Sequence, residues 1–269
     1  MDIRAFLKKE GELPLEQMVT NGGFCGILQR IACIGDSLSS AEMEGKRDGQ
    51  KSFHDMMEYS WGQFLARDAG VTVYNFSKGG MTAKAYLEGF AEERGFWSPE
   101  LAAKAYIIAL GVNDVSRVME GEMKLGSIAD VHPDAPEQNP HSFAGAYGAI
   151  ISRYKQLQPH AKFFLMTMPS HHEQDERGIL YDRHATLLYE MAALFENCYV
   201  LDFRKYAPDY NDEFKKNFYL GGHLSAAGYR LTALMVESYI DYIIRHNPDD
   251  FRQIAFVGTP HHNEDEKWS

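Results

Sequence analysis

Short apolar runs alternate along the chain with segments in which apolar residues recur every three or four positions. The runs are rich in β-branched and aromatic residues and almost continuously apolar, which is typical of strands covered on both faces. They predict strands at residues 30–34, 71–76, 105–110, 162–166 and 198–201. Strand–helix alternation of this kind favours a parallel sheet with right-handed crossovers and helices on both faces.

Helical periodicity is clearest in three segments, where apolar side chains repeat with a spacing of about 3.6 residues. We expect these stripes to pack in the core and not to line a cofactor site. They are Phe143, Tyr147, Ile150, Ile151 and Tyr154; Leu187, Leu188, Met191 and Leu194; and Leu231, Leu234, Met235, Tyr239 and Tyr242. Ser225 stands where it would cap the start of the last helix.

This order of elements predicts one α/β domain over residues 26–250, with an N-terminal arm at 1–25 and a C-terminal tail at 251–269. A chain of 269 residues with 45% hydrophobic content can bury one sizeable core. Two stretches interrupt the alternation, at residues 115–140 and at the polar segment 169–177. Long loops above a sheet often carry function, so we expect both to shape a ligand pocket.

The net charge indicates which partners to expect, and the cysteine content indicates the redox compartment. The formal net charge of −11 argues against nucleic acid and anionic membrane surfaces as partners. The three cysteines form no CxxC pair, and their odd number fits a reducing compartment. The sequence has neither the apolar stretch of a signal peptide nor the ~20 apolar residues of a membrane helix. We therefore expect a cytoplasmic protein, and its oligomeric state is not indicated.

Residues suited to chemistry follow three of the predicted strands, where open α/β sheets bind their ligands. The first strand runs into Gly35-Asp36-Ser37-Leu38, where the glycine permits a tight turn that would expose Ser37. Gly79 and Gly80 follow the second strand and would let the backbone approach a ligand with a free N–H. Gly111-Val112-Asn113-Asp114 follows the third strand, and its Asn113 amide could donate to a developing oxyanion.

A fourth candidate is His223, which follows Gly221 and Gly222 and precedes the last helix. Its loop would return to the carboxyl edge of the sheet. Each of these segments also has an ordinary structural explanation as a helix cap or a β–α turn, because Gly, Ser, Asn and Asp favour such positions. Taken singly, none of them identifies a function.

Taken together, the four segments resemble, in order and spacing, the blocks that define the SGNH hydrolases, also called GDSL-like lipases and acylhydrolases. The blocks are Ser37 in GDSL, Gly80, Asn113 in GxND, and the late His223, and the match extends over about residues 31–229. The resemblance implies the fold of that family. This is a three-layer α/β/α sandwich, flavodoxin-like, around a mainly parallel five-stranded sheet.

The resemblance also implies a mechanism. Ser37 would attack an ester carbonyl, and His223 would take its proton and later protonate the leaving alcohol. The backbone N–H groups of Ser37 and Gly80 and the Asn113 side chain would form the oxyanion hole. No cofactor is implied. His171, His172 and His184 lack the spacing of a metal motif such as HExxH, so we expect no metal site.

The sequence departs from the family pattern at the acid of the triad, which usually stands three residues before the histidine. Here that position is Leu220. Upstream carboxylates that could orient His223 instead are Asp202, Asp209, Asp212 and Glu213. A backbone carbonyl could also hold the ring in a Ser–His dyad, or the site could be inactive. In subtilisin, loss of the acid cost roughly a hundredfold less than loss of the serine or histidine, so we expect retained activity.

We therefore expect a carboxylic ester hydrolase for small acyl esters, acetyl above all, on a carbohydrate or a similar polar metabolite. Polar loops around the expected pocket and the lack of an apolar lipid-binding helix favour this substrate class. The alternative is a catalytically degenerate SGNH-fold protein that uses the same pocket to bind a carbohydrate or an acylated ligand. A dinucleotide-binding enzyme is excluded because no GxGxxG follows the first strand.

Overall fold

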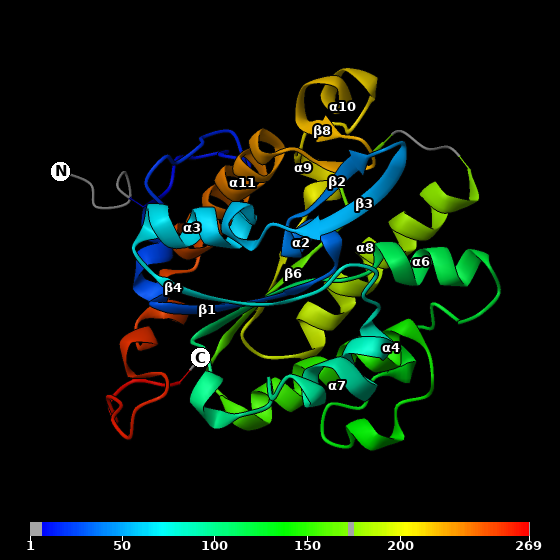
Figure 1. Ribbon diagram of the computed structural model, residues 1–269. Coiled ribbons are helices and arrows are strands. Elements are labelled where there is room, and N and C mark those ends of the chain that lie inside the picture. The colour runs from blue at the N-terminus through cyan, green and yellow to red at the C-terminus, as the bar shows by residue number, and fades with distance from the viewer. Residues whose placement is uncertain (1–6, 172–174, 269) are drawn as a thin grey trace.

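A computed structural model describes residues 7–171 and 175–268. At its centre lies a parallel sheet with the strand order β4-β1-β5-β6-β7 (Figure 1). Its strands are β1 (Arg30–Gly35), β4 (Thr72–Ser77), β5 (Ala105–Ala109), β6 (Lys162–Met166) and β7 (Cys198–Leu201). All five predicted strands are confirmed to within one residue at each end. Their continuous apolar runs are explained by burial on both faces of the sheet.

Helices cover both faces and make this a three-layer α/β/α sandwich (Figure 1). One layer contains α7 (Phe143–Leu157) and α8 (Glu176–Leu194), and the other contains α3 (Trp61–Ala69) and α11 (Ala226–His246). The shorter helices are α2 (Ser37–Ser40), α4 (Ala83–Ala85), α5 (Ala91–Glu93), α6 (Val112–Met119), α9 (Phe203–Tyr206) and α10 (Asp212–Phe218). A π-helical turn occupies residues 86–90, and 3₁₀ turns occupy 23–28, 57–59, 99–101, 128–130, 136–138, 248–251 and 254–256.

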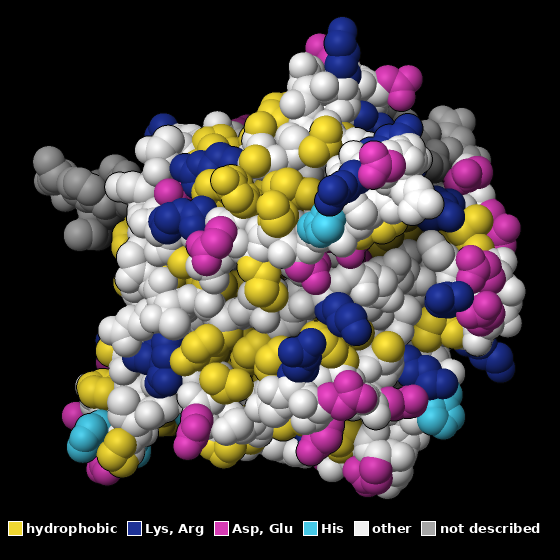
Figure 2. Space-filling model, in the orientation of Figure 1, with side chains coloured by type: hydrophobic (Ala, Val, Ile, Leu, Met, Phe, Trp, Pro, Cys, Tyr) yellow, Lys and Arg dark blue, Asp and Glu magenta, His cyan; other side chains and the backbone are white. Residues whose placement is uncertain are grey.

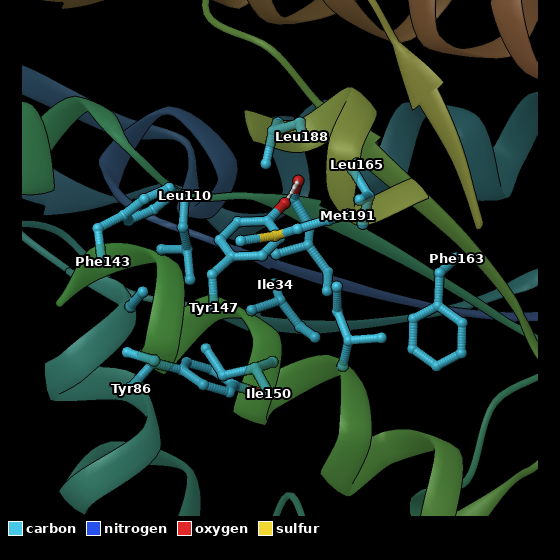
Figure 3. Close-up of a cluster of buried hydrophobic side chains, with 14 of the residues drawn as sticks. Ile34, Tyr86, Leu110, Phe143, Tyr147, Ile150, Phe163, Leu165, Leu188 and Met191 are labelled. Carbon is cyan, nitrogen blue, oxygen red and sulfur yellow. Dashed lines mark hydrogen bonds between the residues drawn. The ribbon is translucent and has the colours of Figure 1, made fainter. Parts of the chain in front are cut away.

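The sheet separates two hydrophobic cores, one on each face. Figure 3 shows part of the core under α7 and α8, where Tyr147 lies among aliphatic side chains. Its buried hydroxyl donates to the Ile108 carbonyl oxygen at 3.0 Å, so the ring carries no unsatisfied polar atom into the core. The predicted apolar stripes lie on α7, α8 and α11 as expected. Leu194, in the last turn of α8, is the exception and is 42% exposed.

The strand order brings the segments that carry the candidate catalytic residues to one edge of the sheet. The chain adds β4 on one side of β1 and then β5 on the other, so the connections diverge between β1 and β5. Ligands of open α/β sheets bind at such a switch point, beyond the carboxyl ends of the strands. The segments that follow β1, β4 and β5 carry Ser37, Gly80 and Asn113, respectively.

Two small antiparallel hairpins lie outside the main sheet and were not predicted from the sequence. One consists of β2 (Glu42–Arg47) and β3 (Gln50–Asp55), and the other of β8 (Tyr219–Leu220) and β9 (His223–Leu224). The first hairpin turns at Asp48 and Gly49, which have φ values of 51° and 80°. Positive φ at both central residues is typical of a type I′ turn, for which Asp-Gly is a favoured sequence.

The described parts of the terminal segments contact the sandwich. Glu12 forms an ion pair with Arg245 of α11 at 2.7 Å, and the Phe24 N–H donates to Asp241 of the same helix at 2.9 Å. Near the other end, the Trp268 ring stacks on His160 with ring centroids 3.9 Å apart. In the described part of the chain, no helix combines the length and the apolar character needed to cross a lipid bilayer.

Candidate active site

Ser37 is the first residue of α2, immediately beyond the carboxyl end of β1. Asp36 caps this short helix, because its Oδ1 accepts the Leu38 N–H at 3.0 Å. Gly35 permits the turn, since a Cβ there would lie 2.2 Å from Ser39 Oγ. The Ser37 N–H makes no hydrogen bond to any described residue, so it is available to a ligand.

Gly80 lies in the turn after β4, which the Met81 N–H closes on the Lys78 carbonyl oxygen at 3.3 Å. Its φ of 73° is the positive value that a type II turn requires at the third position, where glycine has no Cβ penalty. Within the described residues the Gly80 N–H also has no hydrogen-bond acceptor. Two backbone donors of the expected oxyanion hole are therefore unpaired.

Asn113 lies in the first turn of α6, after β5. Its Nδ2 donates to the Met81 carbonyl oxygen at 3.1 Å and to Asp36 Oδ2 at 3.3 Å. Both amide hydrogens are therefore used within the protein. To donate to a substrate oxygen, the amide would have to exchange one of these partners.

His184 of α8 packs against the segment that carries Asn113 and has no exposed surface. Its Nε2 lies 3.1 Å from the Leu110 carbonyl oxygen, and a Cβ at Gly111 would lie 2.4 Å from the same nitrogen. Burial lowers the pKa of His184 to about 4, which keeps the ring neutral. Its role is to pack beneath the Asn113 loop.

Two buried carboxyl groups join the loops around Ser37. Asp36 contacts Asn113, and Asp114 Oδ1 accepts the Ala83 N–H at 3.0 Å. Burial raises the pKa of each group to about 7, although the hydrogen bonds that each accepts from backbone N–H groups act to lower it. Both side chains make hydrogen bonds that connect the loops around Ser37.

His223 begins β9, in the turn that leads to α11, and Ser225 caps that helix by accepting the Gly228 N–H. Ser37, Asn113 and His223 all line one cavity of about 520 Å³. The Ser37 hydroxyl makes no hydrogen bond within the described chain, so its direct contact with His223 remains a prediction. Gly80 is not among the residues that line this cavity.

The two interrupting loops contribute unequally to the cavity. Pro169 and His171 of the polar segment 169–177 line it, although residues 172–174 of that segment lie outside the described residues. The expectation for residues 115–140 was wrong, because no residue of that stretch lines the cavity. The stretch begins within α6, which carries it away from the sheet edge, and it borders other surface hollows instead.

The carboxylate that contacts the His223 ring is that of Glu42, which the sequence reasoning missed. Glu42 Oε1 lies 3.2 Å from His223 Nε2, and each side chain is 18% exposed. The other ring nitrogen, Nδ1, is buried and has no hydrogen-bond partner among the described residues. The Asp48-Gly49 turn was the one signal in the sequence for the hairpin that carries Glu42.

The four carboxylates proposed from the sequence take other positions. Asp202 is buried and caps α9, and it accepts the Thr167 hydroxyl at 3.0 Å and the Tyr189 hydroxyl at 2.8 Å. Asp212 and Glu213 are exposed in the first turn of α10, and Asp209 is half-buried between α9 and α10. No described hydrogen bond or ion pair joins Asp202, Asp212 or Glu213 to His223, which corrects the expectation for these three residues.

The histidines considered for a metal site do not form one in the described chain. His171 Nδ1 lies 3.1 Å from the Tyr210 carbonyl oxygen, whereas His184 packs under the Asn113 loop. His172 lies outside the described residues. Within the described residues no group of three or more His, Cys, Asp or Glu side chains is placed to hold a metal ion.

A second, smaller cavity of about 40 Å³ adjoins the first. The two share four lining residues, namely Leu38, Val112, Met168 and Pro169. The walls of the smaller cavity are mostly apolar, and Trp61 and Met166 also contribute to them. The site thus combines a wide open cavity with a narrow apolar recess.

The sequence matches a known family of hydrolases. The sequence profile of the GDSL-like Lipase/Acylhydrolase family matches residues 33–231, a range that includes Ser37, Gly80, Asn113 and His223. No curated protein sequence matches the chain.

Solved structures share the fold. One is the acetyl xylan esterase AlAXEase, at 20% identity and a TM-score of 0.52, covering 78% of this chain and 99% of that one. Another is a family two carbohydrate esterase from Clostridium thermocellum in complex with cellohexaose, at 16% identity and a TM-score of 0.57. That similarity covers 87% of this chain and 66% of the esterase. At such identities the similarity shows the shared fold.

Proposed function

Because the chain belongs to the GDSL-like lipase/acylhydrolase family, we propose that it is a serine esterase that hydrolyses small acyl esters, acetyl esters above all. Membership in this family supports ester hydrolysis as the class of reaction. Within that class, Ser37 is the nucleophile and His223 is the general base. The Ser37 and Gly80 N–H groups and the Asn113 amide stabilise the oxyanion.

The observation that carries the proposal is the convergence of Ser37, Asn113 and His223 on one open cavity. These residues come from three segments that are far apart in the sequence. A serine that merely capped a helix would have no need of a histidine and an unpaired backbone donor nearby. Convergence of a nucleophile, a base and oxyanion donors around one space is the geometry that acyl transfer requires.

The reaction then proceeds through an acyl-enzyme. Ser37 Oγ forms a bond to the ester carbonyl carbon while its proton passes to His223, and the carbonyl oxygen becomes an oxyanion held by the N–H donors. Collapse of this intermediate breaks the bond to the alcohol, which leaves with the proton from His223. Water then attacks the acyl-enzyme with His223 as base, which releases the acid and restores Ser37.

The shape of the site supports a small acyl group. The narrow recess that shares Leu38 and Met168 with the main cavity has a volume of about 40 Å³. One water occupies about 10–15 Å³ on this measure, so the recess holds only a few heavy atoms. Its apolar walls suit the methyl group of an acetyl ester better than a long acyl chain.

The wider cavity supports a polar alcohol. Its rim includes Lys215, Tyr181 and His171, and the exposed ring of Phe53 packs against His223 with centroids 5.8 Å apart. Polar groups with one exposed aromatic ring suit a carbohydrate, which offers hydroxyl groups at its edges and an apolar C–H face. Two relatives of the same fold are described as an acetyl xylan esterase and a carbohydrate esterase.

The alternative is a binding protein that has lost catalysis, and Leu220 at the usual acid position is the feature that favours it. Hydrolysis of p-nitrophenyl acetate, butyrate and octanoate separates the two. We expect activity that falls with acyl length and is abolished in Ser37→Ala. Ser152→Ala, which removes a buried hydroxyl on α7, is the matched control with unchanged activity.

Absence of activity on all three esters is followed by labelling with a serine-directed phosphonate. An activated Ser37 reacts with this reagent, whereas the serine of a binding protein does not. Wild-type protein that neither hydrolyses an ester nor takes up the label would overturn the proposal.

A further inference from the structure

We propose that Glu42, at the start of the β2–β3 hairpin, is the positioning residue of His223 and fixes its ring with the proton on Nε2. This inference rests on the proposed function, because it assigns the acid partner of the same catalytic base. It would make the site a triad whose acid follows the nucleophile by five residues instead of preceding the histidine by three.

The contact between Glu42 and His223 has the features of an orienting pair. The two atoms lie 3.2 Å apart, and both side chains are largely shielded from water. A charged hydrogen bond in such surroundings is stronger than one at an exposed surface. Leu220, at the family's usual acid position, is 52% exposed and pairs with His223 only through the backbone of the β8–β9 hairpin.

The backbone around Glu42 is fixed on both sides. Ala41 ends α2 with a φ of 61°, which turns the chain from the Ser37 helix directly into β2. The Glu42 carbonyl oxygen accepts the Tyr229 hydroxyl at 2.7 Å, and the same hydroxyl lies 3.3 Å from the Ser37 carbonyl oxygen. One buried tyrosine of α11 therefore holds the nucleophile and the proposed acid in a fixed relation.

The position of the Glu42 carboxylate also explains why residue 79 is a glycine. A Cβ at Gly79 would lie 2.1 Å from Glu42 Oε2, so no side chain fits there while the carboxylate keeps its place. Gly79 has no positive φ, so backbone conformation does not require glycine at this position. The close approach that two adjacent glycines predicted is thus, at Gly79, an approach to Glu42.

The rest of the hairpin holds the turn that carries His223. Glu44 Oε2 accepts the Gly222 N–H at 3.1 Å, and Lys51 pairs with Glu44 at 2.7 Å. Phe53 packs the edge of its ring against His223 with an interplanar angle of 70°. The hairpin therefore contacts the histidine through its ring and through the preceding backbone.

The contact with Glu42 determines which nitrogen of the His223 ring would act as the general base. With Nε2–H donated to Glu42, the lone pair of neutral His223 is on Nδ1, the nitrogen without a described partner. In the proposed reaction Nδ1 receives the Ser37 proton and returns it to the leaving alcohol, while Glu42 keeps accepting the Nε2–H of the ring. In the serine protease arrangement the acid binds Nδ1 and the serine faces Nε2, so the two nitrogens exchange roles here.

The test compares three forms of the full chain with wild type. Glu42→Gln keeps the volume and a hydrogen-bond acceptor but removes the charge, and Glu42→Ala removes the contact. Asp48→Asn is the matched control, because it removes one negative charge from the exposed tip of the same hairpin. Nitrogen-15 NMR of the histidine rings reports the protonated nitrogen of His223, and steady-state kinetics on p-nitrophenyl acetate report kcat and KM separately.

We expect wild type, Asp48→Asn and Glu42→Gln to show His223 protonated on Nε2 in its neutral form, and Glu42→Ala to show a mixture of tautomers. We expect kcat to fall roughly 10⁴-fold in Glu42→Ala, as on loss of the acid of other triads, with an intermediate fall in Glu42→Gln and little change in KM. Wild-type kcat in Glu42→Gln, or a proton on Nδ1 in wild type, would overturn the inference. If no ester is hydrolysed, the proposed function fails, while the ring signals still decide whether Glu42 holds Nε2–H.

Discussion

The Asn113 amide nitrogen lies 3.3 Å from Asp36 Oδ2, which joins the loop that carries the proposed nucleophile to the loop that carries the proposed oxyanion donor. The same nitrogen donates to the Met81 carbonyl oxygen, next to Gly80. One side chain thus connects the segments that follow β1, β4 and β5. The position of the oxyanion hole therefore depends on this amide and on the carboxyl group that holds it.

Replacement of Asn113 by alanine tests its proposed role in catalysis. Loss of one oxyanion donor costs about 10²–10³-fold in kcat, because the donor acts on charge that develops only in the transition state. We expect Asn113→Ala to lower kcat on p-nitrophenyl acetate by this amount with KM nearly unchanged. A rise in KM at constant kcat would instead indicate a role in ground-state binding.

Replacement of Asp36 by asparagine tests whether the carboxyl group acts through Asn113. The substitution keeps the Leu38 cap, since the amide oxygen can accept that N–H, but it replaces the oxygen that faces Asn113 with an NH2 group, which cannot accept a hydrogen bond. We expect kcat/KM to fall about tenfold, the worth of one hydrogen bond to a charged group. In an Asn113→Ala background the same change should have little effect, whereas additive losses in the double-mutant cycle would show that Asp36 acts independently.

The sequence predicted those parts of the molecule that local pattern determines. Continuous apolar runs marked the five strands, and Ser37, Gly80 and Asn113 stood where such strands end. The β2–β3 hairpin was missed because its residues are mostly exposed and show no apolar alternation, although Asp48-Gly49 marked its turn. The contact of Glu42 with His223 joins residues far apart in the sequence, so it depends on how the hairpin packs on the β8–β9 turn, which no local pattern reports.

Enlargement of the apolar recess tests the proposed limit on acyl length. Met168 is buried and lines both the recess and the main cavity, so Met168→Ala should admit a longer acyl chain. Burial of a methylene group contributes about 0.8 kcal/mol, so the butyrate-to-acetate ratio of kcat/KM should rise roughly tenfold for two methylene groups. Met119→Ala, at an exposed position in the last turn of α6, is the control. An unchanged ratio in a folded Met168→Ala variant would place the acyl group elsewhere.

Glu237 should make the stability of the protein depend on pH. Its side chain is fully buried in α11, and burial, with the nearby Asp68 carboxylate, raises its pKa to about 8 from an ordinary value of 4.5. Between these values the folded state keeps a proton that the unfolded chain has lost, so the free energy of unfolding falls as pH rises, by at most about 1.4 kcal/mol per pH unit. Above pH 8 both states are ionised and this contribution stops changing.

Glu237→Gln removes this titration, because glutamine is neutral at every pH. We expect urea unfolding at pH 5, 6.5 and 8 to show that Glu237→Gln gains stability relative to wild type as pH rises, with the smallest difference at pH 5. Glu190→Gln, at an exposed position on α8, should give a difference that is independent of pH. Parallel pH profiles for wild type and Glu237→Gln would mean that Glu237 is ionised in the folded state, which requires that the nearby Arg230 compensates its burial.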